Sequence, residues 1–246
     1  MKDHEKEFLA QYRPEDFPRP SVAVDVVVLT VQDGKLRVLL VARKEHPFKG
    51  KWALPGGFLR VGKSSRDQGE DLDAAAAREL EEETGLSPSQ VFVEQLAAFG
   101  RANRDPRMRV VTIAYFALVR PDLLALVRPG GDASRVKWTA VDEALDPKND
   151  HERLAFDHAD IVRAARARVI ERLETSPIAK NLVPEPFTIP ELRATFETVS
   201  GKKLDRGNFR RKFAQLVERG VVERAPGKRA TASKPAAVYR FRDATR

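Results

Sequence analysis

Three glutamates stand close together near the end of an alanine-rich segment, AAAARELEEETGL (74–86). Glu79, Glu82 and Glu83 have i, i+3 and i+4 spacing, which places them on one face of a helix. Acids are disfavoured there, because the C-terminal end of a helix carries partial negative charge and carboxylates one turn apart repel. Two interpretations are open: a solvated acidic face, or a hard divalent cation as counter-charge, since Mg²⁺ binds carboxylates together with substrate phosphates.

The surrounding residues favour the metal site. RELEEETGL has the form R-E-U-x-E-E-x-G-U, where U is a bulky aliphatic residue, and Glu70 lies eight residues before Arg78. This pattern resembles the Nudix hydrolase family, whose motif is G-x5-E-x7-R-E-U-x-E-E-x-G-U. The resemblance implies that Glu79, Glu82 and Glu83 bind catalytic Mg²⁺ or Mn²⁺ and that one of them helps to activate water. It also implies that Arg78 and Glu70 pair to orient the loop and the helix.

The chemistry implied by this resemblance is hydrolysis of a nucleoside diphosphate linked to a further group. Metal ions neutralise phosphoryl oxygens and lower the pKa of the attacking water. The reaction needs no covalent nucleophile, which agrees with the absence of cysteine from the chain. A thiolate zinc site and a disulfide framework are excluded for the same reason.

The chain departs from the motif at its first glycine. That position is occupied by Ser64, and the natural match is Gly57, with twelve intervening residues in place of five. We interpret residues 62–68 as a polar insertion, which leaves hydrolysis intact, alters the substrate or hinders turnover. Gly56 and Gly57 in the loop WALPGGF are expected to border the ligand.

A second arginine-rich loop, FGRANRDPRMRVV (99–111), has two interpretations. Arg104 and Arg107, together with Arg101 and Arg109, either clamp a diphosphate through bidentate hydrogen bonds or form a charged hairpin turn. RDPR also resembles the ADP-ribose-directed branch of Nudix proteins, which implies ADP-ribose as the ligand. The four histidines lack metal-site spacing, and His158 is expected to be structural.

The distribution of apolar residues predicts a mixed α/β domain built from antiparallel hairpins. Asp33 and Gly34 indicate the turn between the first two strands. Predicted strands are 21–31, 35–43, 91–99, 109–119 and 136–138, and predicted helices are 71–84 and 154–173. The 246 residues contain no apolar run long enough for a membrane span and no signal peptide, so we expect a soluble, cytoplasmic protein.

Positive charge is concentrated in the last third of the chain. Residues 175–246 hold 16 Lys/Arg against 7 Asp/Glu, a net charge of +9, whereas the remainder holds 28 against 29. Such asymmetry indicates either a merely solvated surface or an acidic partner, commonly nucleic acid. Residues 175–187 contain three prolines, which is typical of a linker. We therefore place the boundary here, between a domain of residues 1–175 and a domain of residues 176–246.

The basic segment has the element order of a winged helix-turn-helix. Thr188 and Glu191 form a capping box that begins one helix, and Asp205 is the N-cap of a second. Two strands then flank a basic loop at 226–235. The second helix has a predicted core stripe, and its other side carries polar and basic residues. Its core residues are Phe209, Phe213, Leu216 and Val217.

We expect the second helix to enter the DNA major groove, with the loop near the backbone or minor groove. Asn, Gln and Arg suit base edges, whereas Lys mostly contacts phosphate. A small helical module for dimerisation is the alternative. The candidate DNA-binding residues are Arg206, Asn208, Arg210, Arg211, Lys212, Gln215, Lys228 and Arg229.

The order of the two domains resembles the Nudix-related transcriptional regulators of NAD metabolism. The resemblance runs over nearly the whole chain, through RPSVAVDVVV, FKGKWALPGGF, RDPR, LAFDHADI, FTIPELR, NFRRK and KPAAVYRF. It implies an α/β (α+β) Nudix sandwich with a C-terminal winged helix, ADP-ribose as effector, and a homodimer that represses genes from a palindromic site on double-stranded DNA. A Nudix hydrolase with a non-regulatory tail and a non-catalytic sensor remain the alternatives.

Overall fold

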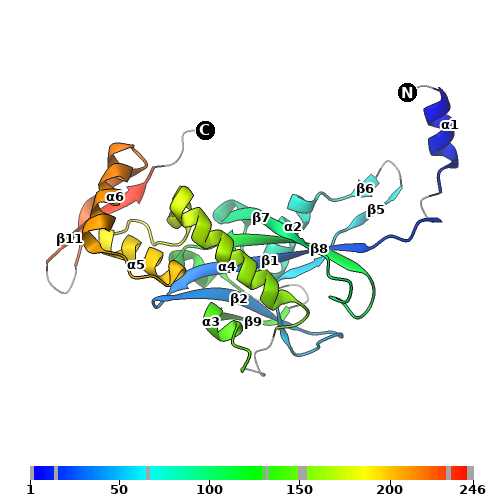
Figure 1. The fold of residues 1–246 in the computed structure, drawn as a ribbon, viewed down its shortest axis with the longest axis horizontal. Helices are drawn as coiled ribbons and strands as arrows, with labels where there is room; N and C mark the ends of the chain where they lie inside the picture. Colours follow the sequence, from blue (N-terminus) through cyan, green and yellow to red (C-terminus); the bar gives the residue numbers. More distant parts are fainter. Residues whose placement is uncertain are drawn as a thin grey trace.

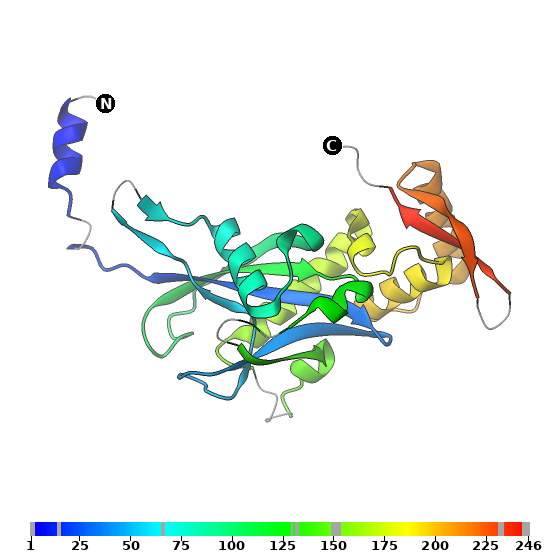
Figure 2. The ribbon, with the colours of Figure 1, turned by 180° about the vertical axis from the view of Figure 1, so that it is seen from behind.

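The computed structural model describes residues 3–13, 16–64, 67–128, 130, 133–148, 154–230 and 234–242. A seven-stranded sheet carries helices on both faces, and a smaller unit of two helices and a hairpin lies at one end (Figure 1). The predicted mixed α/β sheet and the C-terminal winged helix are therefore confirmed. A further helix, α1 (Asp3–Gln11), which the sequence analysis did not predict, projects away from the body (Figure 2).

The centre of the sheet is β1 (Ser21–Gln32). The predicted hairpin joins it antiparallel to β2 (Lys35–Arg43), and Asp33 and Gly34 have φ of 52° and 68°, as a tight hairpin turn requires. β1 also pairs in parallel with β8 (Val110–Leu118), a pairing that the sequence analysis did not predict. The remaining strands of this sheet are β3 (Trp52–Ala53), β4 (Gly56–Phe58), β7 (Phe92–Phe99) and β9 (Ala133–Ala140), the last longer than predicted.

Both faces of β1 are buried, and its alternate side chains enter two cores. Val24, Val26 and Val28 pack with residues of α2 (Leu72–Thr84). Val27 and Leu29 pack on the opposite face with residues of α4 (His158–Thr175). The side-chain period of two along a strand explains why a near-continuous valine run supports a helix on each side.

The helix predicted from residue 154 begins later, at His158. Phe156 has a φ of 53°, in the left-handed region, which a right-handed helix cannot contain. Residues 154–157 therefore form a loop that leads into α4. The short helix α3 (Val141–Ala144) and the 3-10 turns η2 (Pro88–Gln90), η3 (Pro121–Leu126) and η5 (Pro177–Asn181) complete the connections.

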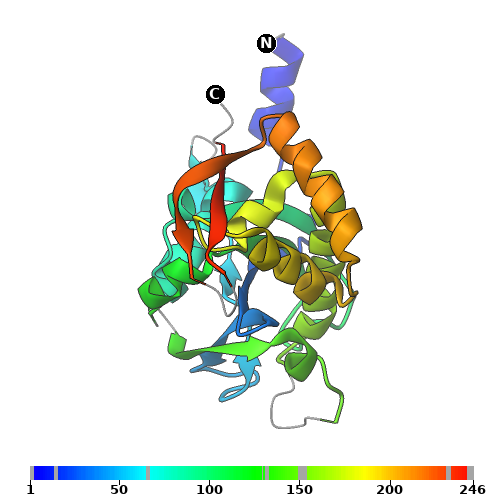
Figure 3. The ribbon, with the colours of Figure 1, turned by 90° about the vertical axis from the view of Figure 1, so that its left-hand side faces the viewer.

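The smaller unit, which faces the viewer in Figure 3, contains α5 (Ile189–Ser200), α6 (Arg206–Glu218), β10 (Val222–Arg229) and β11 (Ala236–Phe241). Its apolar interior continues into the larger domain: Leu192, Val199 and Phe209 belong to the same core as Val27 and Leu40. The Thr198 hydroxyl also donates to the Gly34 carbonyl at 3.5 Å. The boundary between residues 175 and 176 stays a prediction. Among the described helices, none is long and apolar enough to cross a membrane.

Candidate functional site

The glutamate helix is α2, and its position follows from its buried face. Ala75, Ala76 and Leu80 pack against the sheet, and Gly85 ends the helix with a φ of 73° in the left-handed region. This packing turns Glu79, Glu82 and Glu83 towards a cleft of about 590 Å³.

The glycines of the loop 52–57 allow close contact with these acids. The Gly56 N–H donates to Glu83 Oε2 at 3.0 Å. A Cβ on Gly57 would lie 2.3 Å from Glu79 Oε1, and one on Gly56 would lie 2.3 Å from the Val24 carbonyl oxygen. The obstacle at Gly56 is backbone, so this position requires glycine for space, whereas at Gly57 the obstacle is the end of the Glu79 side chain, which a Cβ would displace.

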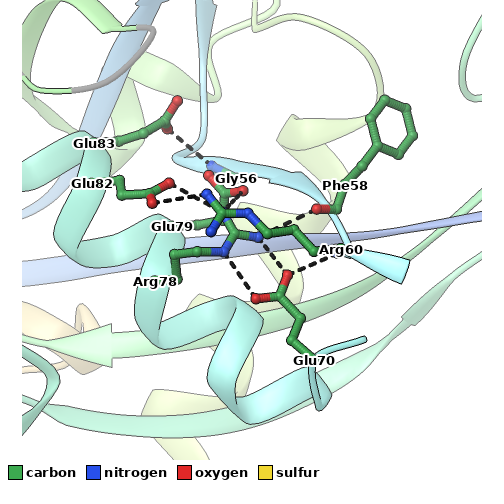
Figure 4. Close-up of polar contacts among 8 residues, drawn as sticks. All are labelled: Gly56, Phe58, Arg60, Glu70, Arg78, Glu79, Glu82 and Glu83. Carbon is green, nitrogen blue, oxygen red and sulfur yellow. Dashed lines mark hydrogen bonds and ion pairs between the residues drawn. The ribbon is translucent and has the colours of Figure 1, made fainter. Parts of the chain in front are cut away.

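Arg78 is the hub of the site (Figure 4). Its Nη2 donates to Glu70 at 2.6 Å, and its Nη1 donates to Glu79 at 2.7 Å and to Glu82 at 3.1 Å. The Arg60 side chain adds a contact to Glu82 at 3.0 Å. The predicted pairing of Arg78 with Glu70 is present, and it ties the start of the motif to the helix.

These contacts set the protonation of the carboxyls. The hydrogen bond from Arg78 holds the pKa of Glu70 at about 2, against an ordinary 4.5. The pKa of Glu79 is raised, because burial outweighs its hydrogen bond with Arg78. Two acids that bind the same guanidinium are thus shifted in opposite directions, and their degree of burial makes the difference.

Sequence reasoning assigned a metal ion as the counter-charge of the three glutamates, and the structure shows that an arginine also contacts two of them. Glu79 and Glu82 both accept hydrogen bonds from Arg78. Within the described residues, no group of three or more His, Cys, Asp or Glu is arranged to hold a metal ion. All three acids nevertheless line one cleft. Their carboxylate oxygens are the type of ligand atom that Mg²⁺ and Mn²⁺ prefer, so the residues present fit such a cation chemically.

The structure brings both predicted ligand arginines to the same cleft, but each already has a carboxylate partner. Arg104 is 7% exposed and donates to both oxygens of Asp157, at 2.6 and 3.0 Å. Arg107 is more exposed and pairs with Asp105 at 2.8 Å. The Arg107 guanidinium also lies 5.3 Å from the centre of the Phe58 ring.

Several residues of the cleft were missed by sequence reasoning. Asp25 lies in a buried strand, and the only available signal was its interruption of an apolar run. Arg43 lies 4.8 Å from the centre of the Phe156 ring and also borders the cleft. His158, expected to be structural, is buried at the floor. Asp25 and Arg43 lie on the two strands of one hairpin and His158 lies much later in the chain, at the start of α4, so spacing along the chain could not reveal that they meet.

The polar insertion forms a short hairpin. β5 (Val61–Ser64) pairs antiparallel with β6 (Asp67–Gly69), and residues 65–66 lie outside the described residues. β5 and β6 lie beside the start of α2 in Figure 2 and extend away from the main sheet.

The winged helix is stabilised by the predicted caps. The Thr188 side chain and Glu191 form a reciprocal capping box, and Asp205 accepts a hydrogen bond from the Asn208 N–H. Phe209 and Phe213 are buried as expected. The prediction for Val217 was wrong: it is 40% exposed, whereas its neighbour Leu216 packs against the core.

The candidate DNA-binding residues of α6 are exposed, and they lie on more than one side of the helix. Asn208 and Lys212 border a groove shared with the end of α4. Arg206 and Arg210 border another, between α5 and β11. Arg211 donates to the Asn208 side chain, and Gln215 lies one turn beyond Arg211.

The predicted basic loop at 226–235 is shorter than expected, because β10 continues to Arg229. Residues 231–233 lie outside the described residues. Lys228 is exposed, whereas Arg229 pairs with Glu191 and donates to the Pro186 carbonyl at 2.6 Å. Arg229 thus links this hairpin to the start of α5.

Comparison with known proteins agrees with both parts of this architecture. A NUDIX domain model matches residues 19–164, and a model described as the NrtR DNA-binding winged helix domain matches residues 179–241. The chain therefore belongs to the Nudix family, in the NrtR-type group with a C-terminal winged helix.

Individual relatives cover most of the chain. It is 37% identical over 237 residues to the "ADPR responsive transcriptional repressor NtrR" of Acinetobacter baylyi, across 96% of this chain and 88% of the relative. Shewanella oneidensis NrtR, solved with a 27mer DNA, is 32% identical with a TM-score of 0.72, covering 90% of this chain and 93% of its own. The Nudix domain of that protein, solved with ADP ribose, is 36% identical with a TM-score of 0.57, covering 67% and 98%.

Proposed function

We propose that this protein is an ADP-ribose-responsive transcriptional repressor. The Nudix cleft holds ADP-ribose, and the winged helix binds double-stranded DNA. The observation that carries the proposal is the similarity to the Acinetobacter repressor over 96% of this chain. Two features of the molecule support it: a polar cleft of suitable size and an exposed basic face on α6.

The cleft offers the groups that a nucleoside diphosphate needs. Arg43 against Phe156 and Arg107 against Phe58 supply cationic and aromatic surfaces at its walls. We assign the diphosphate to the region between the Glu79 face and the loop 104–107. Arg107 is the more accessible of the two predicted ligand arginines, while Arg104 shapes the floor through Asp157.

The intact glutamate motif supports a second activity, hydrolysis of the bound ADP-ribose. Glu79, Glu82 and Glu83 would hold Mg²⁺ or Mn²⁺, which lowers the pKa of water and neutralises phosphoryl charge. Arg78 and Glu70 would orient these acids. We expect Glu82→Gln with Glu83→Gln to abolish metal-dependent cleavage and Mn²⁺ binding, the latter followed by electron paramagnetic resonance. Unchanged Mn²⁺ affinity in a folded double variant would remove the metal assignment.

On DNA, we propose that a homodimer reads a palindromic operator. Two α6 helices would enter successive major-groove faces about 34–36 Å apart, or a multiple of that spacing. Arg211, Asn208 and Gln215 are assigned to base edges. The residues assigned to phosphate are Arg206, Arg210, Lys212 and Lys228, whereas Arg229, also a candidate from the sequence, is held by Glu191.

The proposal is tested by selecting bound sequences from a random DNA pool and titrating the selected site with and without ADP-ribose. We expect an enriched palindrome whose affinity changes with ADP-ribose. The matched control is the triple variant Arg206→Ala, Arg210→Ala and Arg211→Ala, which keeps the shared core intact. A pool without enrichment, or equal DNA affinity in this variant, would leave the Nudix hydrolase interpretation in its place.

A further inference from the structure

His158 begins α4 and lies beneath the cleft, only 4% exposed. Its Nδ1 accepts a hydrogen bond from the Leu54 N–H at 2.9 Å, so the proton of the neutral ring is assigned to Nε2. Nε2 lies 3.5 Å from Asp25 Oδ1, and the other oxygen of Asp25 lies 3.4 Å from Arg104. Buried carboxylate and arginine groups thus fix the ring and aim Nδ1 at the loop.

The loop 52–57 is held from two sides. On one side, the Ala155 N–H donates to the Trp52 carbonyl at 2.8 Å, next to the contact between Leu54 and His158. On the other side, the Gly56 N–H donates to Glu83, and Gly57 lies against Glu79. A displacement of His158 therefore moves the loop that contacts two of the three glutamates.

The same helix reaches the winged helix at its other end. Ala165, Val169 and Leu173 of α4 are buried in the core that contains Leu192 and Val199 of α5. Figure 1 shows α4 crossing the sheet towards α5. Its first residue is thus hydrogen-bonded to the cleft loop, while its last turns pack where the winged helix is anchored.

We propose that His158 is a positioning residue that couples occupation of the cleft to DNA binding. It fixes the loop 52–57 through Leu54, and α4 transmits a change in that loop to α5. The inference rests on the proposed ADP-ribose response, and it adds the residue and the helix that carry the response.

Two substitutions separate this role from general packing. His158→Asn keeps an acceptor at the δ position, whereas His158→Gln moves its amide one bond further, towards Asp25. Coupling is measured as the ratio of DNA dissociation constants with and without ADP-ribose, using the operator selected from the random pool. A buried N–H left without an acceptor is costly, so we expect His158→Gln to weaken ADP-ribose binding about tenfold and lower the coupling ratio by a similar factor. DNA affinity without ADP-ribose should stay within about twofold of wild type, since α6 is unchanged.

His158→Asn should retain most of the coupling, and Arg163→Gln, at an exposed position of the same helix, should retain all of it. The Leu54 amide resonance reports the hydrogen bond directly and should shift in His158→Gln. A shifted resonance with an unchanged coupling ratio would overturn the role of His158.

The wild-type protein provides a test that needs no substitution. The Leu54 amide and the His158 ring nitrogens should both respond to ADP-ribose and also to operator DNA. A response to ADP-ribose without a response to DNA would overturn the inference alone. A wild-type coupling ratio of one would instead overturn the proposed ADP-ribose response itself, and the coupling with it.

Discussion

The cleft and the recognition helix both carry many charged side chains, but they differ in how those charges are balanced. In the cleft, Arg78 and Arg104 are each held by two or more carboxylates and are largely buried. On α6, the basic side chains are exposed. Clustered charge thus has two uses. In the cleft, ion pairs within the chain fix the positions of the charged side chains, whereas the exposed cationic face of α6 keeps its attraction for a polyanion.

The largest expected effect of a single substitution in the cleft is at Arg78. Arg78→Ala leaves Glu70, Glu79 and Glu82 without their shared guanidinium, and we expect a loss of about 3 kcal/mol of unfolding free energy. Arg60→Ala is the matched control, because it removes an exposed side chain whose ion pair is with Glu82. That change should cost less than about 1 kcal/mol. Urea denaturation of both variants measures the difference, and equal losses would contradict the assignment of Arg78 as the hub.

On the exposed side, the largest expected effect is at Arg211. Arg211→Ala should weaken binding to the selected operator by about 1–3 kcal/mol and relax discrimination at one base pair, because arginine can bind a base edge. The unfolding free energy should stay within about 0.5 kcal/mol of wild type. Binding titrations against the operator and its single-base variants provide the measurement. An equal loss on every sequence would assign Arg211 to phosphate.

Two neighbouring residues of β10 differ in the same way, since one basic side chain is exposed and the other is paired with a carboxylate. Lys228 is exposed, so Lys228→Ala should lower the salt slope of DNA binding by about one unit on any sequence. Arg229 is paired with Glu191, so Arg229→Ala should mainly lower the unfolding free energy, by about 1 kcal/mol. DNA titrations at several salt concentrations, with denaturation alongside, separate the two. A lower slope in Arg229→Ala would show that its guanidinium exchanges Glu191 for phosphate.

The smallest expected effect is the loss, at low pH, of the contribution of Glu191 to the unfolding free energy. Burial alone would raise the pKa of Glu191, but hydrogen bonds from Thr188 and Arg229 outweigh it and hold the pKa below 4.5. A lowered folded-state pKa gives stability above the unfolded value, which is lost as the pH falls through the folded value. The advantage of wild type over Glu191→Gln should therefore be full at pH 7 and shrink below pH 4.5. An advantage that stays constant down to pH 3 would contradict this assignment.

Much of this molecule could be predicted from local sequence. The hairpin at Asp33–Gly34, the capping box at Thr188 and the helix end at Gly85 each depend on the conformation of a few adjacent residues. The pairing of Arg78 with Glu70 followed from a family motif. Each of these features is encoded within a short stretch of chain.

The features that could not be predicted from the sequence depend on residues that are far apart in the chain and meet only in the folded structure. The parallel pairing of β1 with β8 joins segments about ninety residues apart. Asp25, Arg104 and Asp157 likewise meet from three separate segments. Arginine as the counter-charge of Glu79 and Glu82 was not predicted either, because helix spacing gives the direction of an acid but not the position of a neighbouring guanidinium.

The apolar interior that runs from the sheet into α5 and α6 has a consequence for biosynthesis. A ribosome delivers β1 and β2 well before residues 187–209, whose apolar side chains belong to the same core as Leu40 and Val169. Until the last quarter of the chain emerges, part of that interior faces water and invites association with other nascent chains. A premature stop within this stretch should therefore yield a fragment that is less soluble than the whole protein, because it exposes apolar side chains that α5 and α6 otherwise cover.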